Sequence, residues 1–409
     1  MSGVAELVLE AARVVVPGGR PARCVAVGGG RVLAVGDRSD VEPVTDGATR
    51  RIQLEDSVVL PGWVDAHGHV LAHGFALQRV DLSSARSLDH LIEVVARKAA
   101  STPAGEWIHG QGWDHTRWPG AALPVHARIS RAVPDHPVYL RRVDMHAALV
   151  NAAAMRRAGL DRHATSPPGG DILRDAAGEP TGVLVDTAAG LVDKVVPPPG
   201  RAAMRAALRR ALESLARLGI TGVHDAGTGL APDLGITDRD DPGWLAVDLY
   251  RELAADGHLG LRVYAMLGGN FAYPPVESYF ERPPVMDDCG GRLTVRTVKI
   301  GVDGALGSRG AALDEPYDDA PDTRGLLTRR GDLVETVLRR GFESGWQIAV
   351  HAIGDRANRL VLDAVAAARA AVPGVRDPRP RIEHAQILRP EDLPRFRELG
   401  VIASVQPVH

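Results

Sequence analysis

Four histidines and one lysine in this sequence fall at or near the ends of short apolar segments. They are His67, His69, Lys299, His351 and His384. Neutral imidazole nitrogen is a ligand that zinc and similar divalent ions accept readily. A catalytic metal site keeps one coordination position open for water, so the pattern predicts metal-assisted hydrolysis.

Each of these residues has a structural alternative when it is taken alone. His67-Gly68-His69 is a pattern that arises easily among 15 histidines, His351 lies between apolar residues, and His384 follows an acidic residue. Lys299 is more informative, because a lysine in an apolar strand either extends its amine to the surface or is used chemically. We expect one shared site because all of these residues fall at strand ends.

Strand geometry predicts which of these side chains point the same way. Residues two apart on a strand face the same side. Asp65, His67 and His69 therefore share one face, and Lys299 and Asp303 share another. If both faces point inward, the histidines and the lysine meet at one rim of a barrel.

Seven apolar segments alternate with helical patterns in the way that parallel βα units do. The expected strands are Ser57–His67, Ile220–Ala226, Leu261–Leu267, Val295–Asp303, Gln347–Ala352, Arg381–Ala385 and Val401–Gln406. The expected helices are Ala202–Leu218, Leu333–Ser344, Asn358–Ala371 and Pro390–Leu399. The pattern predicts an α/β fold, a (β/α)8 TIM-like barrel with seven of its eight strands in this sequence.

Two other regions complete the expected domain organisation. Residues 1–57 hold short β-branched segments separated by glycines, which is typical of a small antiparallel β domain. The barrel takes residues 58–409, and a segment of about 85–200 is inserted after its first strand. Such an insertion would lie over the carboxyl ends of the strands, where barrel enzymes keep their active sites.

Composition narrows the classes of function. The 409 residues have a net charge of −3 and no polybasic run, which disfavours nucleic-acid binding. No apolar run reaches the roughly 18 residues of a membrane span, and the first residues lack the features of a secretory signal. Cys24 and Cys289 lie far apart, which disfavours a disulfide framework or a zinc finger. We expect a cytoplasmic protein that binds neither nucleic acid nor a membrane.

Longer motifs surround the candidate ligands and extend the pattern. They are PGWVDAHGH (Pro61–His69), VKIGVDGALGSRGAAL (Val298–Leu313), VHAIGDRAN (Val350–Asn358), RIEHAQIL (Arg381–Leu388) and SVQPVH (Ser404–His409). The first resembles the opening signature of the amidohydrolase superfamily. Together they are similar to its YtcJ-like branch, amidohydrolase family 3, which contains N-substituted formamide deformylase. GQGWDHTRW (Gly110–Trp118) and PVYLRRVDMHAALVN (Pro137–Asn151) resemble the segment that this branch inserts.

The resemblance implies a binuclear metal centre, usually of zinc. His67 and His69 would bind one ion and His351 and His384 the other. Lys299 matches the position that CO2 carboxylates in such enzymes, and the carbamate would bridge both ions. A metal-bridging hydroxide would then attack the carbonyl of a non-peptide carbon–nitrogen bond, as in an N-substituted amide or formamide. Lys299, His384 and Asp303 are the candidate catalytic residues.

Four further residues are candidates for contacts with the substrate or with the ligands. They are His146, Arg309, Trp113 and Asp355. An ion pair or a helix cap is an equal alternative for Arg309 and Asp355, and Trp113 could instead pack the insertion onto the barrel. The expected partner is a small-molecule amide. The resemblance leaves a homodimer open, and the sequence identifies neither the substrate nor the metal.

The resemblance also requires an aspartate at the end of an eighth strand, which would bind the buried ion and carry a proton to the leaving amine. The sequence ends at His409, directly after the seventh expected strand. We expect the eighth strand and the rest of a composite β domain to lie in a continuation of the chain. A barrel without its eighth strand would expose the edges of the two strands beside the gap. The alternatives are a mononuclear deaminase or cyclic amidase of the same superfamily, and a truncated inactive chain.

Overall fold

The computed structural model describes residues 3–143, 147–167, 170–230, 242–268, 276–307 and 309–407. The chain divides into two compact units. The first comprises Met1–Val64 with Gly219–Thr221, and the second comprises Asp65–Leu218 with Gly222–His409. Among the described helices, none is long and apolar enough to cross a membrane.

The first unit is built on a four-stranded sheet in the order β3-β2-β1-β4. Its strands are β1 (Leu7–Val14), β2 (Ala22–Gly28), β3 (Arg31–Gly36) and β4 (Arg50–Val59). The first three are antiparallel, as expected, with a turn at Gly29 and Gly30, whose positive φ angles of 55° and 71° suit glycine. β4 instead runs parallel to β1, because the connection through α1 (Arg38–Val41) and η1 (Glu42–Val44) carries the chain to the other edge.

Seven parallel strands form a nearly closed barrel, in the order β18-β17-β16-β15-β13-β12-β5. They are β5 (Trp63–Gly68), β12 (Ile220–Ala226), β13 (Arg262–Gly268), β15 (Leu293–Gly301), β16 (Gln347–Ala352), β17 (Arg381–His384) and β18 (Ile402–Ser404). A short strand, β14 (Val285–Asp287), pairs antiparallel with β15. Six of the seven expected strands match these within a few residues.

The first expected strand, Ser57–His67, is wrong in its first half. The structure assigns Ser57–Val59 to β4 of the small sheet and begins the barrel strand β5 at Trp63. Pro61 lies between the two strands, and proline has no backbone N–H to give to a sheet ladder. One continuous β-rich segment therefore serves two sheets.

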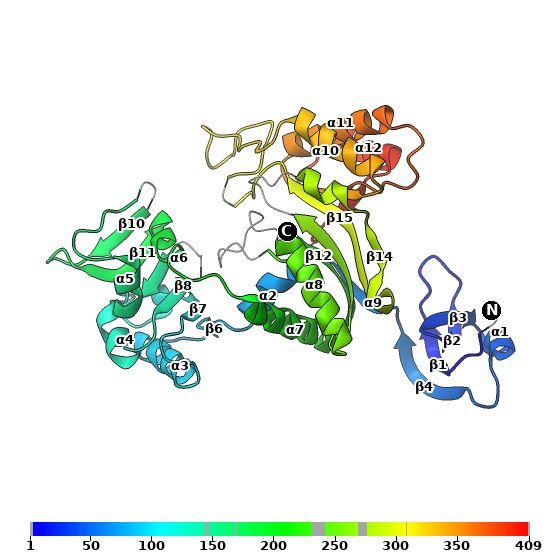
Figure 1. Cartoon of the computed structure of the whole chain (residues 1–409), viewed down its shortest axis with the longest axis horizontal. Helices are drawn as coiled ribbons and strands as arrows, with labels where there is room; N and C mark the ends of the chain where they lie inside the picture. The colour runs from blue at the N-terminus through cyan, green and yellow to red at the C-terminus, as the bar shows by residue number, and fades with distance from the viewer. Residues whose placement is uncertain are drawn as a thin grey trace. The chain divides into compact units, whose positions relative to one another are not determined.

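Helices follow the barrel strands, and the four that the sequence predicts correspond to α7, α10, α11 and α12. They are α2 (Val70–Ala76), α7 (Arg201–Arg217), α8 (Pro242–Ala255), α9 (Asp288–Gly291), α10 (Gly331–Glu343), α11 (Asp355–Ala371) and α12 (Leu393–Leu399), with 3-10 turns η6 (Val276–Glu281) and η7 (Pro390–Asp392). In α11, Ala357, Val361 and Val365 recur at helical spacing and are buried. Figure 1 shows α10, α11 and α12 gathered together, and α10 packs against α11.

Helices α2 and α7 approach each other closely at Gly74. A Cβ atom at this position would lie 2.0 Å from the backbone oxygen of Ala207, so only glycine allows the contact. The helix α2 begins directly after His69, which is its N-cap residue. The packing of α2 on α7 therefore fixes the chain immediately after the first two candidate ligands.

The inserted segment has a sheet and a core of its own. Its strands, in the order β10-β11-β9-β8-β7-β6, are β6 (Val80–Asp81), β7 (Ile108–Trp113), β8 (Val138–Arg142), β9 (Ala147–Val150), β10 (Gly170–Arg174) and β11 (Pro180–Asp186). Its helices are α3 (Leu88–Ala100), α4 (His126–Ala132), α5 (Ala152–Ala158) and α6 (Gly190–Asp193), with turns η2 (His115–Arg117) and η3 (Thr187–Ala189). Leu91, Ile129 and Leu140 belong to its buried core.

Candidate metal centre

The five candidate ligands lie at or near the carboxyl ends of four parallel barrel strands. His67 is in β5, His69 follows that strand, Lys299 is in β15, His351 is in β16, and His384 ends β17. The register pairs Gly301 with His351 and Ala352 with His384. This register brings the ends of β15, β16 and β17 to the same level, as the sequence pattern predicts.

The histidine rings are neighbours in space. The ring centroids of His67 and His384 are 4.8 Å apart, those of His351 and His384 are 4.5 Å apart, and those of His67 and His69 are 5.4 Å apart. Within the described ranges, no three His, Cys, Asp or Glu side chains are already arranged to hold a metal ion. Binding of an ion by these side chains therefore requires some of the rings to turn.

The end of β17 departs from regular strand geometry. Alternation along an extended strand would send Glu383 and His384 to opposite faces of the sheet. The φ angles of His384 and Ala385 are +77° and +42°, in the left-handed region that non-glycine residues rarely adopt. Backbone strain of this kind occurs at functional sites, and here the His384 ring lies beside the rings of both His67 and His351.

Lys299 is a buried lysine, with 3% of its surface exposed. Burial lowers the pKa of its amine to about 8, with a smaller lowering from Arg381 and an opposing effect of Glu383. The charge of Lys299 contributes to lowering the pKa of His69, His351 and His384. Because its pKa is low, a substantial fraction of the amine is neutral near pH 8.

Glu383 is a site residue that the sequence pattern did not single out. Its carboxylate has no exposed surface, and its Oε2 lies 2.5 Å from Nδ1 of His67. Nε of Arg381 donates to Oε1 of Glu383 over 2.7 Å, and Nη2 of Arg381 donates to the backbone oxygen of Ala66 over 3.2 Å. Arg381 and Glu383 are two residues apart on β17, which is the only sequence signal that could have linked them.

The hydrogen bonds of Glu383 decide its charge. Burial opposes ionisation of the carboxyl, but the hydrogen bonds from His67 and Arg381 and the charge of Lys299 outweigh it and lower its pKa. An ionised Glu383 can only accept, so Nδ1 of His67 carries the proton and Nε2 is left to bind another group.

The other rings are also in the form that binds metals. Nδ1 of His384 lies 2.7 Å from Oε1 of Gln406, an acceptor that leaves Nε2 of His384 available. Burial is the main cause that lowers the pKa of His69 and His384 to about 4 and that of His351 to about 3. These imidazoles are therefore neutral at pH 7, and the donor set fits divalent metal ions.

Asp303 lies beside His351 but holds backbone groups. Its fully buried carboxylate accepts hydrogen bonds from the backbone N–H groups of Ala312 at 2.9 Å, Ile353 at 3.0 Å and Gly354 at 2.8 Å. Oδ1 is also 3.5 Å from Nε2 of His351. The geometry makes Asp303 an anchor for the two loops that flank His351.

Asp225, at the end of β12, has a similar anchoring position. It is 1% exposed, and it accepts hydrogen bonds from the backbone N–H of Val70 at 3.0 Å and from the hydroxyl of Tyr250 at 2.9 Å. The first of these bonds holds the start of α2, one residue after His69. Burial raises the pKa of Asp225 to about 6, although its hydrogen bonds oppose the shift.

Three of the four candidate contact residues are described, and their described contacts are with groups outside the histidine cluster. His146 lies outside the described residues. Trp113 has no exposed surface, belongs to the core of the insertion, and donates from Nε1 to the backbone oxygen of Leu140 over 2.9 Å. The described contacts of Trp113 are those of a packing residue, and they stay within the insertion.

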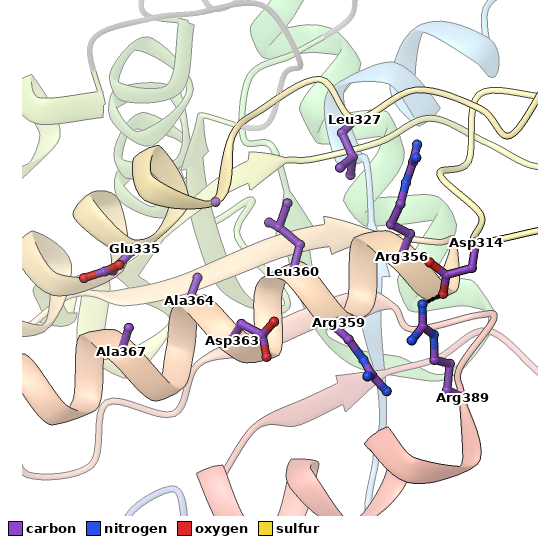
Figure 2. Close-up of a pocket in the computed structure, with 11 residues that line it drawn as sticks. Asp314, Leu327, Glu335, Arg356, Arg359, Leu360, Asp363, Ala364, Ala367 and Arg389 are labelled. Carbon is purple, nitrogen blue, oxygen red and sulfur yellow. Dashed lines mark ion pairs between the residues drawn. The ribbon is translucent and has the colours of Figure 1, made fainter.

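The described contacts of Arg309 and Asp355 are an ion pair and hydrogen bonds at the start of a helix. Arg309 has a positive φ of 54° and pairs with Asp319 over 3.2 Å. Asp355 opens α11 and accepts hydrogen bonds from the backbone N–H groups of Asp314 and Arg356, each at 2.9 Å. Near it, a pocket of about 520 Å³ is lined by Asp314, Arg389 and residues of α10 and α11 such as Arg356 (Figure 2). Arg389 forms an ion pair with Asp314. None of the five candidate ligands lines this pocket.

Comparison with known proteins agrees with the motifs. The sequence profile of the Amidohydrolase family matches residues 50–409. The chain is 30% identical over 394 residues to YtcJ of Bacillus subtilis (strain 168), an alignment that covers 92% of this chain and 71% of that protein. It is 28% identical over 396 residues to the N-substituted formamide deformylase of Arthrobacter pascens, with 94% of this chain and 69% of that protein covered.

A solved structure supports the same assignment. The crystal structure of an uncharacterized metal-dependent hydrolase from Pyrococcus furiosus superposes with a TM-score of 0.75 at 27% identity. The match covers 98% of this chain and 77% of that chain. The expected resemblance is thus confirmed: the chain belongs to the amidohydrolase family and is a metal-dependent hydrolase.

Proposed function

We propose that this enzyme hydrolyses carbon–nitrogen bonds, other than peptide bonds, in N-substituted amides or formamides, and that it uses two divalent metal ions, with zinc as the expected metal. The observation that carries this proposal is the His384 ring, whose centroid lies 4.8 Å from that of His67 and 4.5 Å from that of His351, in a barrel that also buries Lys299. Neutral imidazoles around a buried amine are a donor set for metal ions.

In this proposal each ion takes one histidine pair. His67 and His69 would hold one ion, His351 and His384 would hold the other, and a carboxylated Lys299 would supply a further oxygen ligand. When bound, such ions lower the pKa of a shared water and polarise the carbonyl of the substrate.

Carboxylation of Lys299 needs a neutral amine. The nitrogen lone pair attacks the carbon of CO2, a nitrogen–carbon bond forms while one carbon–oxygen π bond opens onto its oxygen, and one proton passes from the nitrogen to water. Burial lowers the pKa of Lys299 to about 8, so the reactive neutral form is available near neutral pH. The product carries a negative charge that nearby cations stabilise.

The residues around the ligands orient them. Glu383 holds Nδ1 of His67 at 2.5 Å and Gln406 holds Nδ1 of His384 at 2.7 Å, so that both rings present Nε2. Asp303 fixes the loop after β16 through the N–H groups of Ile353 and Gly354.

The substrate class is supported by the likeness to the N-substituted formamide deformylase of Arthrobacter pascens. A formamide would place a small carbonyl carbon at the metal centre and leave an amine substituent to be accommodated elsewhere. Hydrolysis breaks the carbon–nitrogen bond, water supplies the oxygen, and the nitrogen leaves as an amine after it gains a proton.

Metal content and turnover test the proposal together. Purified protein is analysed for bound metal by mass spectrometry and assayed for amine release from a panel of N-substituted formamides and amides. We expect about two ions per chain and an activity that a chelator abolishes and zinc restores. The H67N variant should have a lower metal content and no activity. The matched control is H258N, because His258 is an exposed histidine.

Other results would favour different enzymes. One ion per chain with an unmodified Lys299 would favour a mononuclear deaminase or cyclic amidase. Protein that binds no metal and releases no amine would overturn the proposal for this chain.

A further inference from the structure

A second cavity in the described structure contains none of the candidate metal ligands. It has a volume of about 500 Å³ and is lined by three parts of the second unit. Phe75 and Arg79 come from the end of α2 and the residues after it, Trp107 and Arg157 come from the insertion, and Ala203 comes from the first turn of α7. Because these segments meet where the insertion leaves and rejoins the barrel, we call this the junction cavity.

The junction cavity is electropositive. Among its lining residues Arg79, Lys98 and Arg157 are cations, and Glu106 is an anion. Burial, and then the charge of Arg141, lower the pKa of Arg79, so its guanidinium is partly removed from water and repelled by a like charge. An anion that entered the cavity would reduce this repulsion.

One wall of the cavity is aromatic and held in place. The Arg157 guanidinium lies 5.6 Å from the ring centroid of Trp107 and donates to the backbone oxygen of Gly105 over 2.9 Å. The rings of Trp107 and His109 stack with centroids 6.0 Å apart. Nε1 of Trp107 is buried and has no hydrogen-bond partner among the described residues. A buried N–H without a partner is costly.

The start of α7 adds a positive partial charge to the same cavity. Pro199 and Ala203 line it, and the N-cap of this 17-residue helix is Gly200, which offers no side chain to its first N–H groups. The amino end of a helix attracts anions because its N–H groups point outward and its dipole is positive there. Phe75, Pro103 and Val196 supply apolar surface beside these groups.

We propose that the junction cavity is a binding site for a small organic anion that carries a planar apolar ring, such as an aromatic carboxylate. The carboxylate would lie near Arg157 and Arg79, and the ring would lie against Trp107 and Phe75. The volume is that of a small-molecule site, and the mixture of apolar wall and few charged groups is typical of one.

Calorimetric titration with benzoate tests this site, and benzamide is the uncharged ligand of the same shape. The titrations use the full chain after treatment with EDTA, so that no metal takes part. We expect saturable binding of one benzoate, and at least tenfold weaker binding of benzamide. Loss of a hydrogen bond to a charged group, about 1.5–3 kcal/mol, corresponds to roughly tenfold or more.

Variants of the cavity wall locate the site. R157Q and W107F should each weaken benzoate binding by about tenfold. The matched control is R156Q, because Arg156 is the neighbouring exposed residue of α5 and does not line the cavity. Circular dichroism of each variant establishes that it is folded.

The outcomes separate this site from the metal centre. Benzoate binding that persists without metal, and that falls in R157Q but not in R156Q, supports the proposal whether or not the chain proves to hydrolyse amides. Equal binding of benzoate and benzamide, equal effects of R157Q and R156Q, no binding, or binding that requires added zinc would each overturn it.

Discussion

Nδ1 of His67 lies 2.5 Å from Oε2 of Glu383, a carboxylate with no exposed surface. These residues are 316 positions apart in the sequence. Because the ionised carboxylate can only accept, the bond places a proton on Nδ1 of His67 and leaves Nε2 as the nitrogen that can meet another group. It therefore makes Glu383 a positioning residue for a candidate ligand.

Replacement of Glu383 by glutamine should weaken metal binding while the fold is kept. The amide can still accept one hydrogen bond, but it cannot stabilise the proton on His67 as a carboxylate does. Loss of such a partner reduces metal affinity by about tenfold to a hundredfold. Competition with a chromogenic chelator measures this affinity. E391Q, which changes an exposed glutamate of η7, should leave it unchanged, and equal affinities in E383Q and the wild type would contradict the assignment.

Replacement of Lys299 by methionine should remove both the carbamate and most of the activity. Methionine keeps the length and apolar stem of the buried side chain but has no amine to carboxylate. In protein equilibrated with 13C-bicarbonate, we expect one carbamate carbon signal by NMR in the wild type and none in K299M. K194M changes an exposed lysine and should keep the signal. A wild-type spectrum without the signal would rule out carboxylation.

Asp225 should make the protein less stable as the pH rises from about 4 to 6. Its pKa is raised from 3.8 to about 6 in the fold. Between these values the folded state holds a proton that the unfolded state has released, so stability falls with rising pH by up to about 1.4 kcal/mol per pH unit. Below 3.8 both states are protonated, and above 6 neither is, so the effect is confined to this window.

The D225N variant removes this titration. Its amide oxygen can still accept from Val70, and the Tyr250 hydroxyl can turn to accept from the amide N–H. Urea unfolding at pH 4 and pH 7 should show that the stability of D225N relative to the wild type rises by about 2 kcal/mol between these pH values. D248N, at an exposed aspartate of α8, should show no such gain, and parallel wild-type and D225N profiles would refute the prediction.

Trp113 should be a stability residue of the insertion. Because its ring is fully buried and its Nε1 donates to Leu140, W113A should lower the free energy of unfolding by about 3–5 kcal/mol. Trp63 is 65% exposed, and W63A should change it by about 0.5 kcal/mol or less. Denaturant unfolding measures both. If W113A keeps its stability but binds substrate less well, the prediction is wrong and Trp113 contacts the substrate.

The sequence alone predicted most of the barrel strands, and the candidate ligands lie at or near their ends, for a physical reason. Buried parallel strands need continuous apolar runs, and a charged or imidazole side chain at the end of such a run is easily recognised. His67, Lys299, His351 and His384 all interrupt or end runs of this kind, and the structure places them at neighbouring strand ends.

The contacts across the barrel could not be predicted in the same way. Which carboxylate meets His67 depends on the curvature of the sheet and on the turn at His384, whose φ of +77° no local pattern indicates. The split between β4 and β5 was missed because β-branched residues continue on both sides of Pro61. Trp113 was ambiguous because an aromatic residue suits a pocket wall and a core equally.

The short helix α2 runs from the candidate metal centre to the junction cavity. It starts at His69, packs on α7 through Gly74, and ends at Ala76, just before the cavity residues Gln78 and Arg79. If α2 tilts as a rigid body about its contact with α7, the residues at both of its ends change position. Thermodynamic linkage then requires reciprocity: by whatever factor an anion in the junction cavity changes metal affinity, bound metal changes the affinity for that anion by the same factor.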